Sequence, residues 1–179
     1  SLIGAVGVFA IGWAAREVGS KKSGLIAAGI ASIYAFLWLN DGLLMSETLV
    51  IPIVAIIVGL SARLYNKNSL SLLVLFSVVG GLAVLTRAEL LFAIPFLALP
   101  ILRNSPETLK KRLVRYLFVG IIVISVMTPW VVRNLVQFEE PVFLSNGSGI
   151  LLAQTNCDAT YFGDKQGYWE YLCALPQPV

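Results

Sequence analysis

Six charge-free apolar stretches, separated by short polar joints, constrain the fold of this chain more than any other feature of its sequence. They are 13 to 19 residues long, and a helix that crosses a membrane needs about 20 mostly apolar residues. The alternative is a water-soluble bundle of six buried helices, but the chain lacks the amphipathic segments that would give such a bundle a polar surface. We therefore predict six transmembrane helices, at about 1–15, 23–40, 43–63, 69–86, 88–102 and 113–132.

The composition supports an all-α integral membrane protein. Hydrophobic residues make up 58% of the 179 residues and charged residues 13%, against about 45–50% and roughly 25% in soluble domains. These values exclude disordered chains, collagen-like repeats and small disulfide scaffolds. The sequence contains no histidine, which excludes Ser-His-Asp and Cys-His catalysis and His-ligated metals. Because the chain starts at Ser1 and stops in a loop-like Gln177-Pro178-Val179, we expect it to be part of a longer protein.

The charged residues predict which way the helices point. When the joints are assigned alternately to two sides, one side has ten basic and two acidic residues, a net charge of +8. The other side has three basic and eight acidic residues, a net charge of −5. Cytoplasmic loops are enriched in Lys and Arg, so we expect a multi-pass protein of the plasma membrane with residues 133–179 extracytoplasmic. The sequence pI of about 9.0 is thus a topology signal, and we expect no binding to nucleic acid.

Two acidic residues, Asp41 and Glu47, form the first candidate cluster on the predicted outer side. A helix that starts near Gly42 would place Glu47 about one turn inside the apolar zone, where a carboxylate costs a few kcal/mol. Such an acid usually faces a cavity and serves a function. The alternative for Asp41 is that it caps the helix and complements its dipole.

The second candidate cluster is the Thr86–Glu89 junction, with Arg87 and Glu89. The helix predicted at 88–102 has 15 residues, about 22 Å, which is shorter than the ~30 Å hydrocarbon core. We therefore expect the Arg87 turn to lie below the outer surface in a pocket that water reaches. A guanidinium there suits a phosphate, which it binds through paired hydrogen bonds. The alternative is a structural ion pair of Arg87 with Glu47 or Glu89.

The third candidate cluster lies at the end of the last predicted helix, where Trp130, Arg133 and Asn134 stand together. Trp130 fits the aromatic belt of a membrane interface, and Arg133 could extend to lipid headgroups. Positive-inside bias makes an arginine at an outer helix end uncommon, however. Arg87 and Arg133 therefore offer two cations for an anionic lipid headgroup.

The two cysteines, Cys157 and Cys173, both fall in the predicted extracytoplasmic segment. A disulfide between them would stabilise this segment by roughly 3 kcal/mol. We favour the disulfide over two free thiols, and over a zinc site because two sulfurs without histidine are too few ligands. Aromatic side chains between the cysteines could stack on sugar rings, although such residues more often pack a small loop or rest on the membrane surface.

Three motifs, in this order, make the chain resemble polyprenyl-phosphate-dependent glycosyltransferases of the multi-spanning GT-C type. They are LLMSETL at 43–49, GLAVLTRAE at 81–89 and TPWVVRN at 128–134. The most similar branch contains protein mannosyltransferases and the lipid A aminoarabinose transferase. As in that family, a strand-like run and a Ser-Asn-Gly-Ser-Gly loop at 145–149 follow the last motif. The proline that usually follows the junction arginine is Ala88 here.

The resemblance implies a GT-C-type bundle that transfers a sugar from a polyprenyl-phosphate carrier to a protein, lipid or glycan at the outer face. Arg87, Glu89, Arg133 and Asn134 would bind substrate, with the two arginines neutralising the phosphate. In such enzymes the principal acid lies in a first outer loop that this chain lacks, so Asp41 and Glu47 would be secondary. The sequence leaves open whether a divalent metal assists, and no metal ligands are assigned. The alternatives are a transporter or flippase for a lipid-linked sugar, or a non-catalytic membrane subunit.

Overall fold

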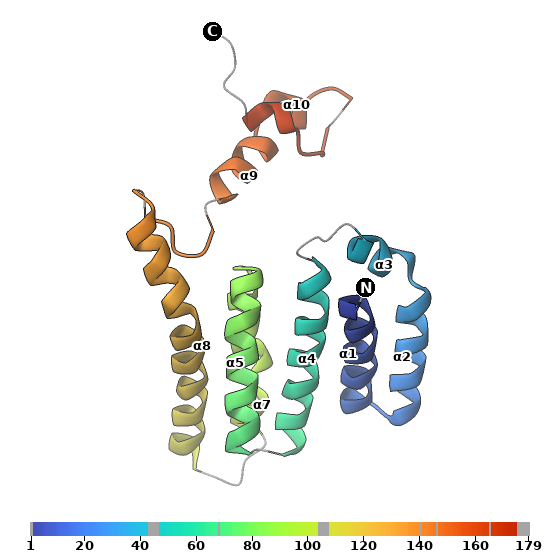
Figure 1. Cartoon of the computed structure of the whole chain (residues 1–179). Helices are drawn as coiled ribbons and strands as arrows, with labels where there is room; N and C mark the ends of the chain where they lie inside the picture. The colour runs from blue at the N-terminus through green and yellow to red at the C-terminus, as the bar shows by residue number, and fades with distance from the viewer. Residues whose placement is uncertain are drawn as a thin grey trace. The chain divides into compact units, whose positions relative to one another are not determined.

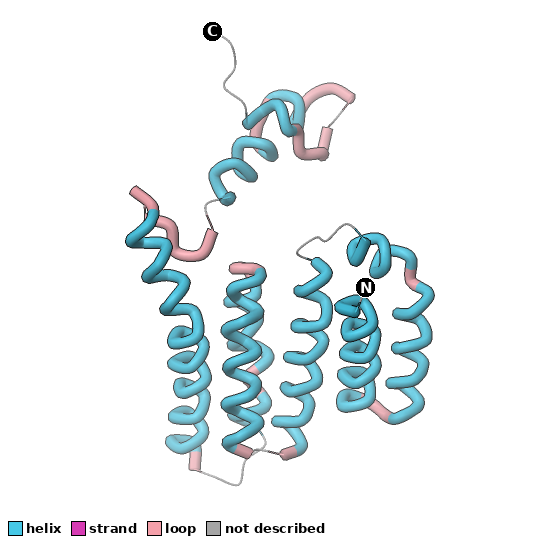
Figure 2. Tube along the Cα trace, viewed as in Figure 1, coloured by secondary structure: helices cyan, strands magenta, loops and turns pink. Residues whose placement is uncertain are grey.

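The computed structural model describes residues 2–42, 47–67, 69–103, 108–139, 141–145, 147–164 and 166–174. Every regular element in these ranges is a helix (Figure 2), which confirms the all-α prediction. The chain divides into two compact units, Ser1–Pro129 and Trp130–Val179. The sequence analysis placed this division between residues 132 and 133. Each unit is described by itself below.

The first two helices form an antiparallel hairpin. Helices α1 (Leu2–Val18) and α2 (Lys21–Ile33) are joined by Gly19 and Ser20, and the Ser20 side chain accepts a hydrogen bond from the backbone N–H of Ser23 at 3.2 Å. The prediction of one helix over 23–40 is wrong, because α2 ends at Tyr34 and α3 (Ala35–Gly42) follows. Near this end the Ser32 hydroxyl donates to the Gly29 carbonyl at 2.7 Å, a bond of the kind that bends helices.

Four more helices complete the first unit together with part of a fifth. They are α4 (Glu47–Asn66), α5 (Leu70–Thr86), α6 (Leu90–Leu97), α7 (Pro100–Arg103) and α8 (Leu109–Gln137), whose residues up to Pro129 belong to this unit. The helix predicted at 88–102 is interrupted at residues 98–99. Pro100 explains the interruption, because a proline has no N–H and disfavours helical geometry in the residue before it.

Only α4 and α8, among the described residues, are long and apolar enough to cross a membrane by length and composition. By this measure the described residues contain two candidate membrane spans, where the sequence analysis predicted about six transmembrane helices. Helices α1 and α5 have 17 residues each and α2 has 13. The extended backbone of Ser20 separates α1 from α2, and the extended backbone of Arg87 (φ −146°, ψ 116°) ends α5.

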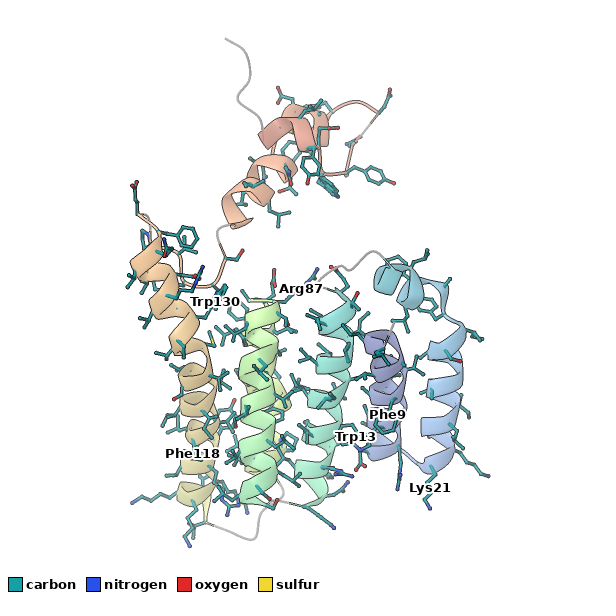
Figure 3. The ribbon with its side chains drawn as sticks, in the orientation of Figure 1. Phe9, Trp13, Lys21, Arg87, Phe118 and Trp130 are labelled. Atoms are coloured by element: carbon teal, nitrogen blue, oxygen red, sulfur yellow. A yellow bond between two sulfur atoms is a disulfide. The ribbon has the colours of Figure 1, made fainter. Side chains whose placement is uncertain are left out.

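Helices α2, α1, α4, α5 and α8 of the first unit lie side by side (Figure 1). Helix α1 packs between α2 and α4, α5 packs on the other side of α4, and α6 and α7 pack against α4. Figure 3 shows Lys21 at one end of these helices and Arg87 at the other. We call these the Lys21 end and the Arg87 end.

Glycines allow the helices to approach closely. A Cβ on Gly12 would lie 2.9 Å from the Cβ of Ala28, and a Cβ on Gly81 would lie 2.6 Å from the Cβ of Val126 in α8. Small residues at helix contacts are typical of bundles in membranes, where van der Waals packing drives association. The side chains buried most completely include Ile57, Leu64, Leu73, Phe76 and Ile101.

Side chains of neighbouring helices bind the carbonyl groups around the interruption between α6 and α7. The Ser61 hydroxyl donates to the Leu97 carbonyl at 2.6 Å, and the Tyr116 hydroxyl donates to the Pro95 carbonyl at 2.9 Å. These carbonyls lack the helical partners that an uninterrupted helix would supply. Irregular backbone within a bilayer is tolerated where other protein groups satisfy it.

The second unit starts at Trp130 in the last part of α8 and continues with α9 (Gly147–Thr155), α10 (Asp158–Tyr161) and the 3-10 helix η1 (Tyr171–Ala174). A disulfide joins Cys157 and Cys173, which confirms that prediction. The described part of 135–149 contains no strand, and α9 already begins at Gly147. The predicted strand-like run is therefore not found in the described residues, and the predicted loop at 145–149 is wrong from Gly147 on. The reason is that turn-forming residues such as Gly and Ser also start helices.

Candidate functional site

Glu47 and Arg87 meet at the Arg87 end of the first unit. Glu47 is the first residue of α4, and Arg87 directly follows the antiparallel neighbour α5. The Arg87 Nη2 atom donates to the Glu47 Oε1 atom in an ion pair. Of the two alternatives that the sequence left open for an ion pair, the structure therefore contains the one with Glu47, 40 positions away.

The backbone that carries Arg87 is held firmly. The Arg87 N–H donates to the Ala83 carbonyl at 2.9 Å, and the Thr86 hydroxyl donates to the same carbonyl at 2.6 Å. The Leu90 N–H then donates to the Arg87 carbonyl at 3.1 Å, so the chain turns directly into α6. Glu89 is the N-cap residue of α6, and its side chain makes no capping hydrogen bond.

The ion pair is accessible to solvent. The Arg87 side chain is 48% exposed and the Glu47 side chain 33% exposed. A guanidinium has five N–H donors in a fixed fork, so a group bound from solvent can share Arg87 with Glu47. The arrangement places one exposed cation and one partly exposed carboxylate at the same helix junction.

Asp41 lies in the last turn of α3, because that helix extends to Gly42. The predicted helix start near Gly42 and the alternative that Asp41 caps it depend on residues 43–46, so both fall outside the described residues. The described part of the next helix starts at Glu47, so the predicted depth of Glu47 within the apolar zone stays a prediction. Residues 43–46 and the Asp41 side chain lie outside the described part of the structure.

Arg133 and Asn134 lie in the second unit, on the last two turns of α8. The Arg133 Nη1 atom donates to the Asn134 Oδ1 atom at 3.1 Å, and the guanidinium carbon lies 5.0 Å from the centroid of the Trp130 ring. Asn134 is only 1% exposed, and its Nδ2 atom donates to the Phe143 carbonyl at 3.4 Å. These contacts anchor the chain after α8 and orient Arg133. A direct role of either residue in substrate binding stays a prediction.

At the Lys21 end, the structure brings together three residues that the sequence analysis did not group. Arg63 contacts Glu17 at two points, with Nη2 to Oε1 and Nε to Oε2 distances of 2.9 Å each. The guanidinium carbon of Arg63 also lies 5.2 Å from the centroid of the Trp13 ring. The hydrogen bond from Arg63 lowers the pKa of Glu17, which follows the apolar stretch 1–15. The residues lie on two helices 46 positions apart, so no local pattern could have revealed the cluster.

The second unit contains a cavity of about 350 Å³ that aromatic side chains border. Tyr161, Tyr168 and Trp169 line it together with Gln166. Trp169 is 55% exposed and Tyr168 is 72% exposed, so these rings are not packed into an interior.

No group of three or more Cys, Asp or Glu side chains that could hold a metal is present in the described ranges. No protein-family model, curated protein or solved structure matches this sequence. The resemblance to GT-C glycosyltransferases therefore rests on the three sequence motifs, and the function that it implies stays a prediction.

Proposed function

We propose that this protein is a multi-pass membrane glycosyltransferase that moves a sugar from a polyprenyl-phosphate carrier to an acceptor at the outer face of the membrane. The observation that carries the proposal is the exposed ion pair between Arg87 and Glu47, at a helix junction within one of the three motifs on which the resemblance rests. The proposal rests on two conditions: the bundle lies in a membrane, and Arg87 binds a phosphate.

The distribution of apolar side chains supports a membrane environment. In its most apolar window, α8 has only 17% of its residues buried within the protein. Large apolar side chains are also exposed on several other helices, among them Leu25, Ile30, Phe92 and Phe96. Exposed apolar surface on this scale marks contact with a membrane or a partner. In a bilayer these side chains would face lipid, and local thinning of the bilayer would accommodate the shorter helices.

The distribution of charge supports the predicted orientation. The Lys21 end carries the turns between α1 and α2 and between α4 and α5, with Arg16, Lys22 and Lys67 in or next to them. The basic start of α8 follows α7, and the Arg112 side chain donates to the Leu102 carbonyl at 2.9 Å. By the positive-inside rule, the Lys21 end would be cytoplasmic and the Arg87 end extracytoplasmic. The disulfide in the second unit suits an oxidising compartment.

Arg87 has the chemistry that the reaction requires. In glycosyl transfer, the acceptor oxygen loses its proton and bonds to the anomeric carbon, while the bond from that carbon to the phosphate oxygen breaks. Negative charge develops on the departing polyprenyl phosphate, and a guanidinium fork stabilises it by paired hydrogen bonds. In the absence of substrate, Glu47 would hold Arg87 in place. When phosphate binds, Glu47 would share or yield the guanidinium, and the proton of the acceptor would pass to the principal acid that the resemblance implies.

Sugar transfer from radiolabelled polyprenyl-phosphate donors, in membranes that carry the protein, tests the proposal. Donors that carry mannose and donors that carry aminoarabinose are tested in separate experiments. Removing a charge-stabilising donor typically costs 100-fold or more in rate, so Arg87→Ala should lower transfer by roughly that factor. Arg87→Lys should recover part of it, because lysine keeps the charge but loses the fork.

Arg63→Ala is the matched control. Arg63 is 46% exposed and paired with a glutamate, as Arg87 is, but it lies at the Lys21 end. Its loss should leave transfer unchanged at equal expression. Equal transfer by wild type and Arg87→Ala would refute the proposal. Labelled sugar that crosses the membrane without attachment to an acceptor would instead indicate a transporter.

A further inference from the structure

A groove runs between α1 and α2 at the Lys21 end, on the opposite end of the helices from Arg87. Its volume is about 370 Å³. The side chains that line it include Phe9, Trp13, Arg16, Lys21, Leu25 and Ala28. Neither the motifs nor the proposed transfer reaction uses this groove. We call it the α1–α2 groove.

Glycines form the floor of the α1–α2 groove. A Cβ on Gly24 would lie 2.7 Å from the Gly12 carbonyl oxygen, and a Cβ on Gly12 would lie 2.9 Å from the Ala28 Cβ. The two backbones therefore touch, and the larger side chains on either side form the walls. Phe9 and Leu25 are 73% and 76% exposed, so the walls stand open to the surroundings.

The groove is apolar along its length and cationic at one end. From Phe9 to Arg16 it extends along seven residues of α1, or about 10 Å. Arg16 near the end of α1 and Lys21 at the start of α2 both border it, since only a short turn separates them. Figure 3 labels Lys21 together with Phe9 and Trp13, which also line the groove. The α1–α2 groove, apolar along its length and positively charged at one end, therefore matches an amphiphile with an anionic head.

The neighbouring acid is already engaged. Glu17 follows Arg16 in sequence, but its two carboxylate oxygens are both bound by Arg63. Arg63 also stacks on Trp13, which fixes one wall of the groove. Arg16 also interacts electrostatically with Glu17, but the hydrogen bonds to that carboxylate come from Arg63, so Arg16 and Lys21 can contact a ligand in the groove.

We propose that the α1–α2 groove binds an anionic phospholipid, with its phosphate between Arg16 and Lys21 and an acyl chain along Phe9, Leu25 and Ala28. Charge complementarity selects an anionic lipid over a zwitterionic one, because a zwitterionic headgroup also brings a cation to the same place. The site is distinct from the proposed carrier site, which lies at the Arg87 end. The inference requires the bundle to lie in a membrane but does not depend on sugar transfer.

Quenching of tryptophan fluorescence by brominated lipids tests this proposal, because Trp13 lines the groove. The chain is reconstituted in phosphatidylcholine vesicles that contain either brominated phosphatidylglycerol or brominated phosphatidylcholine. Subtraction of the signal of Trp13→Phe isolates Trp13 from the other tryptophans. An anionic lipid gains about fivefold in affinity per nearby cation, hence roughly 25-fold for the pair. Brominated phosphatidylglycerol should therefore quench Trp13 at a much lower mole fraction than brominated phosphatidylcholine.

The double variant Arg16→Gln/Lys21→Gln should lose this preference. The matched control Lys110→Gln/Lys111→Gln removes two exposed lysines in the first turn of α8 and should keep it. Equal quenching of the wild type by the two lipids would overturn the proposal, and so would a preference that survives in the double variant. Recovery of Trp13 fluorescence on adding a small amount of unlabelled polyprenyl phosphate, but not unlabelled phosphatidylglycerol, would identify the carrier as the occupant and equally overturn it.

Discussion

The contact of Gly81 with α8 predicts a large difference between two chemically identical substitutions. In α5, a Cβ on Gly81 would lie 2.6 Å from the Val126 Cβ and 3.2 Å from the backbone oxygen of Val123. In α8, a Cβ on Gly120 would have nothing within 4 Å. Gly81→Ala therefore forces α5 and α8 apart, whereas Gly120→Ala adds a methyl group to open space.

The magnitude follows from two terms. Replacing glycine by alanine inside a helix gains about 0.8–1.0 kcal/mol at either position. Overpacking costs about 1–3 kcal/mol, and only at Gly81. The helix term cancels when the two variants are compared, so Gly81→Ala should be less stable than Gly120→Ala by about 1–3 kcal/mol. The backbone oxygen of Val123 cannot rotate away, which favours the upper part of this range.

The free energy of unfolding can be measured in mild detergent micelles by titration with a denaturing detergent, followed by far-ultraviolet circular dichroism. Both variants must first show the helical signal of the wild type. If Gly81→Ala is as stable as Gly120→Ala, the close approach of α5 and α8 is wrong, and so is the packing argument built on glycines.

Two further predictions concern side chains that link distant parts of a unit. Cys157→Ser opens the 16-residue disulfide loop and should lower the free energy of unfolding of the second unit by about 3 kcal/mol. The loss should be seen as faster proteolysis between α9 and η1, and unchanged proteolysis would contradict it. Ser61→Ala leaves the Leu97 carbonyl without its hydroxyl donor and should destabilise the first unit by about 1–3 kcal/mol in the detergent titration. Ser125 is the control for Ser61, because its hydroxyl bonds within its own helix, and equal losses from the two alanine variants would refute the role of Ser61.

The positions of the helices were predictable where local signals agree. The helix predicted at 69–86 is α5 (Leu70–Thr86), since Ser69 caps its start and the apolar stretch ends at Arg87. The disulfide was predictable because the sequence contains only two cysteines. The predictions of continuous helices at 23–40 and 88–102 were wrong because hydropathy does not indicate where a helical backbone is interrupted. Pro100 could have signalled the second break, but no proline or glycine marks the first at Tyr34.

The candidate site was predictable in its residues but not in its contacts. Glu47 and Arg87 stood out as charges beside apolar stretches, and an ion pair between them was one of two alternatives. Which glutamate Arg87 binds depends on how α4 and α5 align, and this alignment is set by packing along their whole length. Asn134 stood out as a motif residue, while its burial and its bond to the Phe143 carbonyl depend on the path of the chain after α8.

The amino-acid sequence alone determined the helical class, the apolar stretches, the asymmetry of charge between their ends and the disulfide. These properties follow from the local density of apolar and charged side chains and from the number of cysteines. Only the tertiary structure decided where helices break, which glycines let helices touch, and which arginine pairs with which glutamate. The physical reason is that these features depend on contacts between residues far apart in the chain, such as Ser61 with the Leu97 carbonyl and Arg63 with Glu17.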